Sequence, residues 1–536
     1  MPFNPEPFEL LEALKIFSYV FLGTTALVFI TMSLIALGAR GKSGPGMVLR
    51  QVWSGIRELT EISLRRVAAI ATLTYRESVR RKVLLVFVLF AVLFMFAGWF
   101  MGDSGAERPD LEVQFHVSFV LRTISWLMLP VVLLLSCWGL PEDIKARSLH
   151  TVVTKPVRRS EVVLGRMLGF ASIGTLVLMV MGVVGYIWIQ RQVPDGAREM
   201  LVCRVPVYGE IAFTDRDGDI SSGTNVGFEW EFRKFIEGGT KARAIWKFDG
   251  ITADAADEEG FLLFESRFEA FRLHKGDMSQ TLLCVFNLYN EDETLRASTP
   301  AFPLDEFGHN LTRIDRRLVA YDTKTNESVT VDLFDDLAEN GTLIVKAQCV
   351  DAGQFLGMAQ SDLFVRLKNR SFLSGFVKSI SGTWLMMVLV VIISVMASCF
   401  LKGPIAAMLT FTFIIIGEGF REFMETLVSF QFTGGGPVES IYRMVTHMNI
   451  QTKMDESIGA YAMKGIDSVL IGGLWLVQHI IPKFDHFSRL SQYLPNGFDV
   501  SWSAALLPCL ATTLAFIFPC VLVGCYSLKL RELESK

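Results

Sequence analysis

Uncharged, apolar runs recur along the chain, and several are long enough to cross a membrane as helices. A helix rises about 1.5 Å per residue and the hydrocarbon core of a bilayer is about 30 Å thick, so a span needs about 20 apolar residues. Seven stretches meet this requirement, the sixth by extending through Glu418 to Phe420: Ile16–Leu37, Val83–Met101, Thr123–Leu140, Met167–Ile189, Trp384–Leu401, Gly403–Gly417 and Ser503–Leu528. A shorter run, Val469–Ile481, contains Gln478 and His479 and is expected to be re-entrant or interfacial. The pattern predicts a polytopic α-helical membrane protein with about seven transmembrane helices.

The composition agrees with this prediction and adds a division within the chain. The 536 residues are 51% hydrophobic and 20% charged, whereas about 25% of residues are charged in a typical soluble domain. Such a balance argues against a single soluble enzyme and against intrinsic disorder. The net charge of -4 is the sum of two parts of opposite sign. Residues 190–378 carry 31 acidic and 22 basic side chains, whereas the remainder carries 24 acidic and 29 basic side chains. An acidic soluble domain is therefore expected within a basic membrane chain.

The charges of the loops predict one orientation, because short cytoplasmic loops of membrane proteins are rich in Lys and Arg. Ala39–Lys82 holds ten basic residues and Pro141–Arg166 holds six, so both are expected inside, whereas the acidic loop Gly102–Gln114 is expected outside. One topology satisfies these loops: the N-terminus and residues 190–378 are extracytoplasmic, seven helices span the cell inner (cytoplasmic) membrane, and the C-terminus is cytoplasmic. The predicted domains are an N-terminal span (1–38), a basic cytoplasmic segment (39–82), three spans with the loop 141–166 (83–189), the outer domain (190–378), two spans (379–420), an outer or re-entrant segment (421–502), and the last span with its tail (503–536).

The insertion at residues 190–378 has the pattern of a β-structure. Apolar and polar residues alternate in five stretches, which are Phe261–Phe271, Leu282–Tyr289, Val329–Leu333, Thr342–Val350 and Asp362–Leu367. Asp-Gly, Gly-Gly and Asn-Gly pairs between such stretches supply turns. A β-rich, sandwich-like domain is predicted. Three cysteines of this domain, Cys203, Cys284 and Cys349, would face an oxidising space, where one disulfide and three buried thiols both agree with their spacing.

Motifs for catalysis or nucleotide binding are missing from the sequence. Gly41-Lys42-Ser43 resembles the end of a phosphate-binding loop, but Ala36 stands where that loop requires glycine. The chain is therefore predicted not to be an enzyme by itself and to bind no metal or other cofactor. Glu418 and Arg421 stand at the outer end of a predicted span, where charges are costly and often functional. Both are candidates for lining a transport pathway, and interfacial snorkelling is the alternative interpretation.

Two cytoplasmic segments have a distinctive design. Ile56–Glu77 is a predicted amphipathic helix with arginines around its end, as expected at an anionic membrane surface. In the loop 141–166, the acidic residues Glu142 and Asp143 suit the N-terminus of a short helix that reaches about Val153. Pro156 then ends this helix, because proline disfavours the helical conformation in the preceding residue. A charged helix held between two spans is suited to transmit force from a cytosolic partner.

Together these segments resemble the permease subunits of ABC-2 type transporters. The resemblance rests on Lys155-Pro156, Arg158-Arg159, Glu161 and Gly165-Arg166-x-x-Gly169, on Arg76-Glu77-x-x-Arg80-Arg81 before a span, and on Leu494-Pro-Asn-Gly-Phe-Asp499 before the last span; it covers roughly residues 70–190 and 375–528. It implies a connecting helix similar to Ile62–Lys82, with Arg76, Glu77, Arg80 and Arg81. It also implies a coupling helix similar to Glu142–Val153, whose loop would contact an ATPase through Glu142, Asp143, Arg147, Thr151, Lys155, Pro156, Arg158 and Arg159.

The resemblance also implies a function and partners. A permease of this family moves its substrate across the membrane while a separate cytosolic ATPase binds ATP and Mg²⁺, and two identical or related permease chains line the path. No nucleic-acid partner is expected. The span Ile16–Leu37 and the insertion 190–378 depart from the six-span family pattern and leave the substrate open. A second hypothesis therefore stands beside transport, in which the chain is a membrane-anchored scaffold and its outer domain binds an envelope partner.

Overall fold

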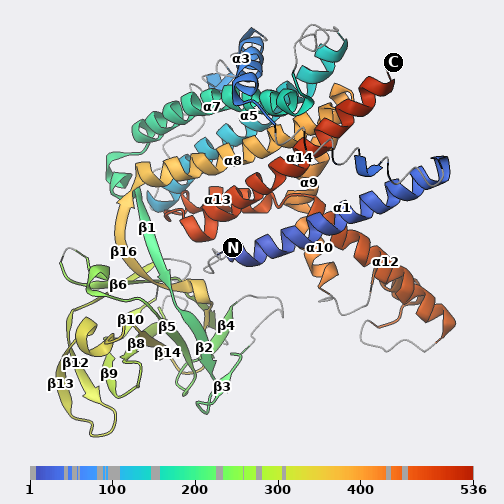
Figure 1. Ribbon diagram of the computed structural model, residues 1–536. Helices are drawn as coiled ribbons and strands as arrows, with labels where there is room; N and C mark the ends of the chain where they lie inside the picture. Colours follow the sequence, from blue (N-terminus) through green and yellow to red (C-terminus); the bar gives the residue numbers. More distant parts are fainter. Residues whose placement is uncertain are drawn as a thin grey trace. The chain divides into compact units, whose positions relative to one another are not determined.

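The computed structural model divides the chain into a helical unit and a β-unit (Figure 1). The structure describes residues 8–40, 46, 48–50, 53, 57, 61–80, 89–90, 92–93, 109–145, 157–224, 233–257, 259–272, 281–304, 309–429, 436–449 and 457–534. The helical unit comprises residues 7–200, 376–496 and 500–536. The β-unit comprises residues 201–375 together with 1–6 and Gly497–Asp499.

Long apolar helices dominate the helical unit. Its elements are α1 (Leu10–Arg40), α3 (Leu64–Arg80), α5 (Pro109–Lys145), α7 (Arg159–Gln192), η2 (Asp195–Met200), α8 (Phe372–Ser398), α9 (Gly403–Gly419), α10 (Arg421–Val428), α11 (Pro437–Thr446), α12 (Ile458–Ile480), α13 (Asp485–Tyr493), η6 (Trp502–Leu506) and α14 (Leu507–Glu534). By length and composition, six stretches of the described chain are able to span a membrane, or seven if the bent pair of α9 and α10 is one span. The described helices agree with the predicted general layout of several long apolar helices.

The individual spans agree with the sequence prediction at most positions. Described helices cover six of the seven predicted spans, and Val83–Met101 lies largely outside the described residues. α8 is the most deeply buried of these helices, with 78% of its most apolar stretch covered by other parts of the protein. Met387, Leu389, Val390 and Val391 of this helix are each fully buried.

α12 differs from the prediction of a short re-entrant segment. It is one helix of 23 residues, and it passes the same test of length and hydropathy as the other candidate spans. Lys464 and Asp467 interrupt its apolar run, which is why the sequence indicated only its second half. The Asp467 carboxylate accepts the backbone N–H groups of Val438 (2.7 Å) and Glu439 (3.1 Å) at the start of α11. These hydrogen bonds satisfy the charge within the helical packing.

The described residues of the β-unit form three antiparallel sheets. Its strands are β1 (Val202–Tyr208), β2 (Glu210–Thr214), β3 (Ile220–Ser221), β4 (Lys234–Glu237), β5 (Arg243–Phe248), β6 (Leu262–Ser266), β7 (Glu269–Arg272), β8 (Leu283–Tyr289), β9 (Leu295–Ser298), β10 (Phe302–Pro303), β11 (Asn310–Ile314), β12 (Arg317–Asp322), β13 (Ser328–Asp332), β14 (Leu343–Cys349), β15 (Gln354–Met358) and β16 (Leu363–Ser371), with short helices η3 (Ala253–Ala255), η4 (Leu333–Leu337) and η5 (Gln360–Asp362). Nine strands form the largest sheet in the order β13-β12-β9-β8-β14-β5-β2-β3, with β10 beside β8. The other sheets are β1-β16-β6-β11 and β4-β15-β7.

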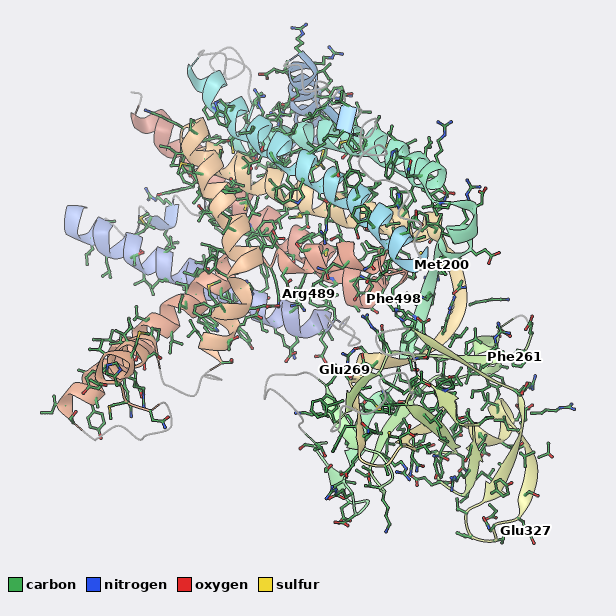
Figure 2. All side chains as sticks on the ribbon, turned by 180° about the vertical axis from the view of Figure 1, so that it is seen from behind. Met200, Phe261, Glu269, Glu327, Arg489 and Phe498 are labelled. Carbon is green, nitrogen blue, oxygen red and sulfur yellow. The ribbon has the colours of Figure 1, made fainter. Side chains whose placement is uncertain are left out.

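The core of the β-unit explains why these strands form. Along β5 and β14, every second side chain is buried, which is the period of a strand with one face on a core. Phe264 of the four-stranded sheet packs against Phe248 and Phe286 of the nine-stranded sheet, with ring centroids 5.7 and 6.2 Å apart. Figure 2 shows the side chains that fill the unit, with Glu269 labelled on β7 and Glu327 at the β12–β13 turn. The prediction of a separate β-rich domain is confirmed, and the domain has one sheet more than a simple two-sheet sandwich.

Turns of this unit follow the predicted residues. Gly218 and Gly341 have φ angles of 96° and 75°, a conformation that residues with a Cβ atom rarely adopt. The carboxylate of Asp215 accepts the N–H groups of residues 217, 218 and 219, each at 3.0 Å, and so closes the first of these turns.

Candidate functional site

A helix, α3, lies where the resemblance expects a connecting helix, and it packs against the start of α7. α3 contains Arg76, Glu77 and Arg80, whereas Arg81 lies outside the described residues. Its buried side chains are Val67, Thr74 and Ser78, and its other face is exposed, with Leu64 82% accessible. This amphipathic helix therefore has one face packed on the protein and one face exposed.

Two glycines of α7 let the helices approach closely. A Cβ atom on Gly165 would lie 2.6 Å from Cβ of Ile70, and one on Gly169 would lie 2.5 Å from Cβ of Thr74. Such separations are too short for real carbon contacts, so these positions require glycine. Glycines four residues apart lie on one helix face and open a groove along it. This is the structural meaning of the Gly165-Arg166-x-x-Gly169 motif.

Buried Glu161 joins Arg158, just before α7, to the segment before α3. Its side chain is fully buried. It accepts the backbone N–H of Ser63 at 2.9 Å and that of Arg158 at 3.0 Å, and it pairs with the Arg66 guanidinium at 3.1 Å. One carboxylate thus caps the N-terminus of α7 and fixes the entrance to α3.

Two further ion pairs bind the same helices. Arg166 donates to the Glu77 carboxylate at 2.9 Å, and its side chain is only 8% exposed. Arg158 pairs with Glu61, and hydrogen bonds from Arg158 and then Arg57 hold the pKa of Glu61 below its usual value. The motifs of the resemblance include Arg158, Glu77, Glu161 and Arg166. Their positions in the linear sequence do not indicate that Arg166 pairs with Glu77 or that Glu161 binds the backbone of Arg158. Glu61 was not singled out at all.

The predicted coupling segment is only partly described. Glu142 and Asp143 belong to α5, which continues through Pro141 to Lys145, so a new helix does not begin at Glu142. Arg147, Thr151, Lys155 and Pro156 lie outside the described residues, and Arg159 is the first residue of α7. The chain between Lys145 and Arg159 thus joins two long helices, α5 and α7.

A cleft of about 1020 Å³ lies among α5, α8, α9 and α13. Pro495 and Asn496, which follow α13, complete its lining. Its polar residues gather toward one end, where Glu418 accepts the Ser488 hydroxyl at 2.6 Å and Gln114 donates to Asn496 at 3.0 Å. Arg122 of α5 lines the same cleft. Leu134 is twelve residues further along α5 than Arg122, or about 18 Å along the helix, and it lies in the apolar part of the lining. The cleft is thus polar at one end and apolar at the other.

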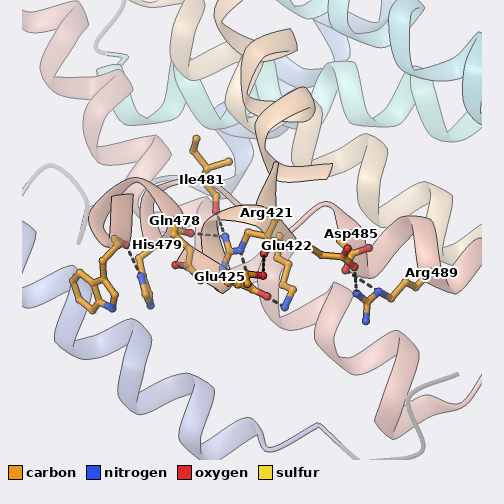
Figure 3. Close-up of polar contacts among 11 residues, drawn as sticks. Arg421, Glu422, Glu425, Gln478, His479, Ile481, Asp485 and Arg489 are labelled. Atoms are coloured by element: carbon orange, nitrogen blue, oxygen red, sulfur yellow. Dashed lines mark hydrogen bonds and ion pairs between the residues drawn. The ribbon is translucent and has the colours of Figure 1, made fainter. Parts of the chain in front are cut away.

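Arg421 does not line this cleft. It hydrogen-bonds to the carbonyl oxygen of Gln478 and, at 3.0 Å, to that of Ile481, and it pairs with Glu425 at 3.1 Å (Figure 3). These carbonyls end α12, so the guanidinium caps that helix. Of the two residues proposed for a pathway, the structure places Glu418 in the cleft and gives Arg421 a contact that stabilises the junction of α10 and α12.

Comparison with protein-family models, with curated proteins and with solved structures found no significant match to this chain.

Proposed function

We propose that this chain is the membrane permease subunit of an ATP-driven transporter of the ABC-2 type, with ATP and Mg²⁺ bound by a separate ATPase subunit. The observation that carries the proposal is the attachment of α3 to the start of α7 through Gly165, Gly169 and the buried Glu161. This contact follows the loop between α5 and α7, and the family resemblance expects an ATPase to dock on that loop. A force applied to the loop would reach α7 and α3 as one body.

The cleft supports the same proposal, because the loop is continuous with one of its walls. α5 lines the cleft with Arg122 and Leu134 and ends at Lys145, where the loop begins. A displacement of the loop would therefore shift a wall that carries both the polar and the apolar part of the lining. This is the relationship that alternating exposure of a substrate site needs.

A second permease copy, or a related chain, is part of the proposal. Trp126 and Met408 line the cleft and are 79% and 70% exposed. Large apolar side chains with this much exposed surface need lipid or another membrane helix against them. Closure by a partner permease would convert the open cleft into an enclosed pathway. The proposed location is the cytoplasmic membrane, with residues 190–378 outside.

The compactness of the β-unit favours a second candidate function. It has its own continuous hydrophobic core, built from all three sheets. A domain of this size exceeds what a loop between two spans requires, so we retain the hypothesis that it binds an envelope partner. In a pure scaffold, this binding would be the function and ATPase coupling would be absent.

Co-purification with ATPase subunits tests the proposal. The full chain is expressed with candidate ATPases, and both retention and ATP hydrolysis are measured in detergent and in lipid. Replacing residues 142–154 by a Gly/Ser linker should abolish retention. Arg216→Ala, which removes an exposed ion pair with Glu237 in the β-unit, is the matched control and should retain the ATPase. Failure of every ATPase to bind, or binding that survives the linker, would leave the scaffold as the better hypothesis.

A further inference from the structure

Two buried cysteines of the β-unit stand directly opposite each other. Cys284 lies on β8 and Cys349 on β14, and the two are register partners in adjacent antiparallel strands at the centre of the nine-stranded sheet. Both side chains are buried, at 0% and 1% exposure. The linear sequence placed them 65 positions apart and offered no reason to choose this pair.

The hydrogen-bond pattern shows which kind of register pair they form. The backbone N–H of Val350 donates to the carbonyl of Leu283 at 3.0 Å, so the neighbouring pair Leu283–Val350 is the hydrogen-bonded one. Pairs alternate along an antiparallel ladder, and Cys284–Cys349 is therefore a non-hydrogen-bonded pair, with Cα atoms about 4.5 Å apart. Disulfides bridge Cα separations of about 4.4–6.8 Å. A register pair of this class thus has the Cα spacing that a disulfide needs.

We propose that Cys284 and Cys349 form a cross-strand disulfide in the mature protein. This rests on the proposed extracytoplasmic position of the domain, where an oxidising thiol–disulfide exchange partner is present. The thiolate of one cysteine attacks the disulfide of the exchange protein and releases one of its thiols. The second cysteine thiolate then attacks the mixed disulfide, forms the intramolecular bond and releases the other thiol. The two cysteines lose two protons and two electrons, and the partner disulfide is reduced to a dithiol.

Cys203 is a poor alternative partner. It lies on β1 in the four-stranded sheet, where its register partner is Arg370. The Cys284 sulfur lies 4.0 Å from the carbonyl oxygen of Val285, and the Cys349 sulfur lies 3.8 Å from the carbonyl oxygen of Asp351. Both thiols are free in the structure, so the two side chains must leave these contacts to form a bond, while the strand register stays the same.

The burial of the pair fixes when the bond forms. A Cβ atom on Gly238 would lie 2.7 Å from the Cys349 sulfur, so the Gly238–Gly239 turn covers this side chain. Burial raises the pKa of Cys284, with a further contribution from Cys349, and burial raises the pKa of Cys349 to about 11. The folded thiols are thus protonated and inaccessible, and oxidation belongs to the folding of the domain.

Thiol counting with peptide mapping tests the proposal on the full chain. The protein is isolated from the membrane of cells with an oxidising envelope, quenched in acid, denatured and alkylated with and without reduction. Six of the eight cysteines should react before reduction and all eight after it. Mass spectrometry should find a reducible link between the peptides that contain Cys284 and Cys349. The variant Cys203→Ser should keep the two-thiol difference, and Cys284→Ser should lose it.

The remaining outcomes separate this inference from the transport proposal. A parallel sample of the denatured full chain is refolded into detergent with oxidised glutathione. If the link forms there and not in cells, the disulfide is overturned for the mature protein and the extracytoplasmic placement loses its support. If it forms in neither, or joins Cys203 instead, the inferred pairing is wrong while ATPase coupling is untouched. Where it does form, reduction should lower the midpoint of thermal unfolding of the domain by roughly 5–10 °C.

Discussion

The guanidinium of Arg166 on α7 lies 2.9 Å from the carboxylate of Glu77 on α3. This ion pair fixes the last turn of the amphipathic helix, while Glu161 fixes the segment before its first turn. Arg166 is 8% exposed and Glu77 is 30% exposed, so the pair is partly shielded from solvent screening. The two ends of α3 are therefore held to α7 by charge, and the middle is held by glycine contacts.

Removing this ion pair should loosen α3. Arg166→Ala leaves Glu77 without this partner in a half-buried position, and we expect a loss of about 2 kcal/mol in the free energy of unfolding. Arg166→Lys should recover part of it, because a lysine keeps the charge but loses the planar fork. A double-mutant cycle with Glu77→Ala, followed by thermal unfolding in detergent, measures the coupling. Strictly additive effects would show that the two side chains do not interact.

The close approach at Gly169 makes a second prediction. Gly169→Ala places a Cβ atom 2.5 Å from Cβ of Thr74 and 2.8 Å from the carbonyl oxygen of Ala71. Overpacking of this kind should destabilise the protein by roughly 1–3 kcal/mol and weaken ATPase retention. Gly473→Ala on α12 is the matched control, since apart from the adjoining backbone of its own helix no atom lies within 4 Å of its added methyl group. It should be neutral or stabilise the helix by up to about 1 kcal/mol. Equal effects at both positions would contradict the packing argument.

The limits of sequence-based prediction are visible in the same residues. The motif around Gly165 and Gly169 was evident in the sequence, but their contacts come from α3, which lies about ninety positions earlier in the chain. Glu161 binds the backbone of Ser63 across 98 residues. Periodicity shows which face of a helix is apolar and says nothing about which distant helix covers it. These contacts could be found only once the helices were placed.

The β-unit shows the complementary case. Alternation predicted β8 and β14 almost to the residue, because each has one face on the core. The order of strands in the sheet could not be predicted from the sequence, since it depends on how segments with the same alternating pattern cross over one another. The pairing of Cys284 with Cys349 is a direct consequence of that order. Local rules thus gave the strands, and long-range packing decided which residues meet.

Neutralising Glu418 should impair transport without impairing assembly. Glu418 lies in the cleft and accepts a hydrogen bond from Ser488. Glu418→Gln keeps an acceptor for that hydroxyl and removes the charge, so the fold should persist. We expect the ATP hydrolysis of the complex, measured in lipid with equal ATPase retention, to fall about tenfold, or ~1.4 kcal/mol. Glu422→Gln, which removes a neighbouring exposed pair with Arg489, should leave hydrolysis unchanged. The reverse ranking would exclude Glu418 from the pathway.

The buried carboxylate of Glu265 predicts how the β-unit responds to acid. It is 2% exposed, hydrogen-bonded to His309 at 3.0 Å, and paired with Arg204 and Arg366. Burial alone would raise its pKa, but the His309 hydrogen bond and the charges of Arg204, His309 and Arg366 hold the pKa below its ordinary value of 4.5. The folded state therefore binds this proton less readily than the unfolded state. Its contribution to stability is complete above about pH 4.5 and is lost as the pH falls through the lower, folded pKa.

Glu265→Gln isolates this contribution. The variant leaves Arg204 and Arg366 without the carboxylate, and the unit should lose about 3 kcal/mol at neutral pH. The readout is hydrogen exchange of peptides from β6 and β16 in the full chain between pH 7 and 4, corrected for the intrinsic pH dependence of exchange. The wild-type advantage over the variant should stay constant down to about pH 4.5 and shrink below it. Glu237→Gln, which removes the partner of the exposed Arg216 guanidinium in the same unit, is the control and should change protection little at any pH. An advantage that grew on acidification would mean that Glu265 is protonated in the folded protein, and the charge cluster would then need a different explanation.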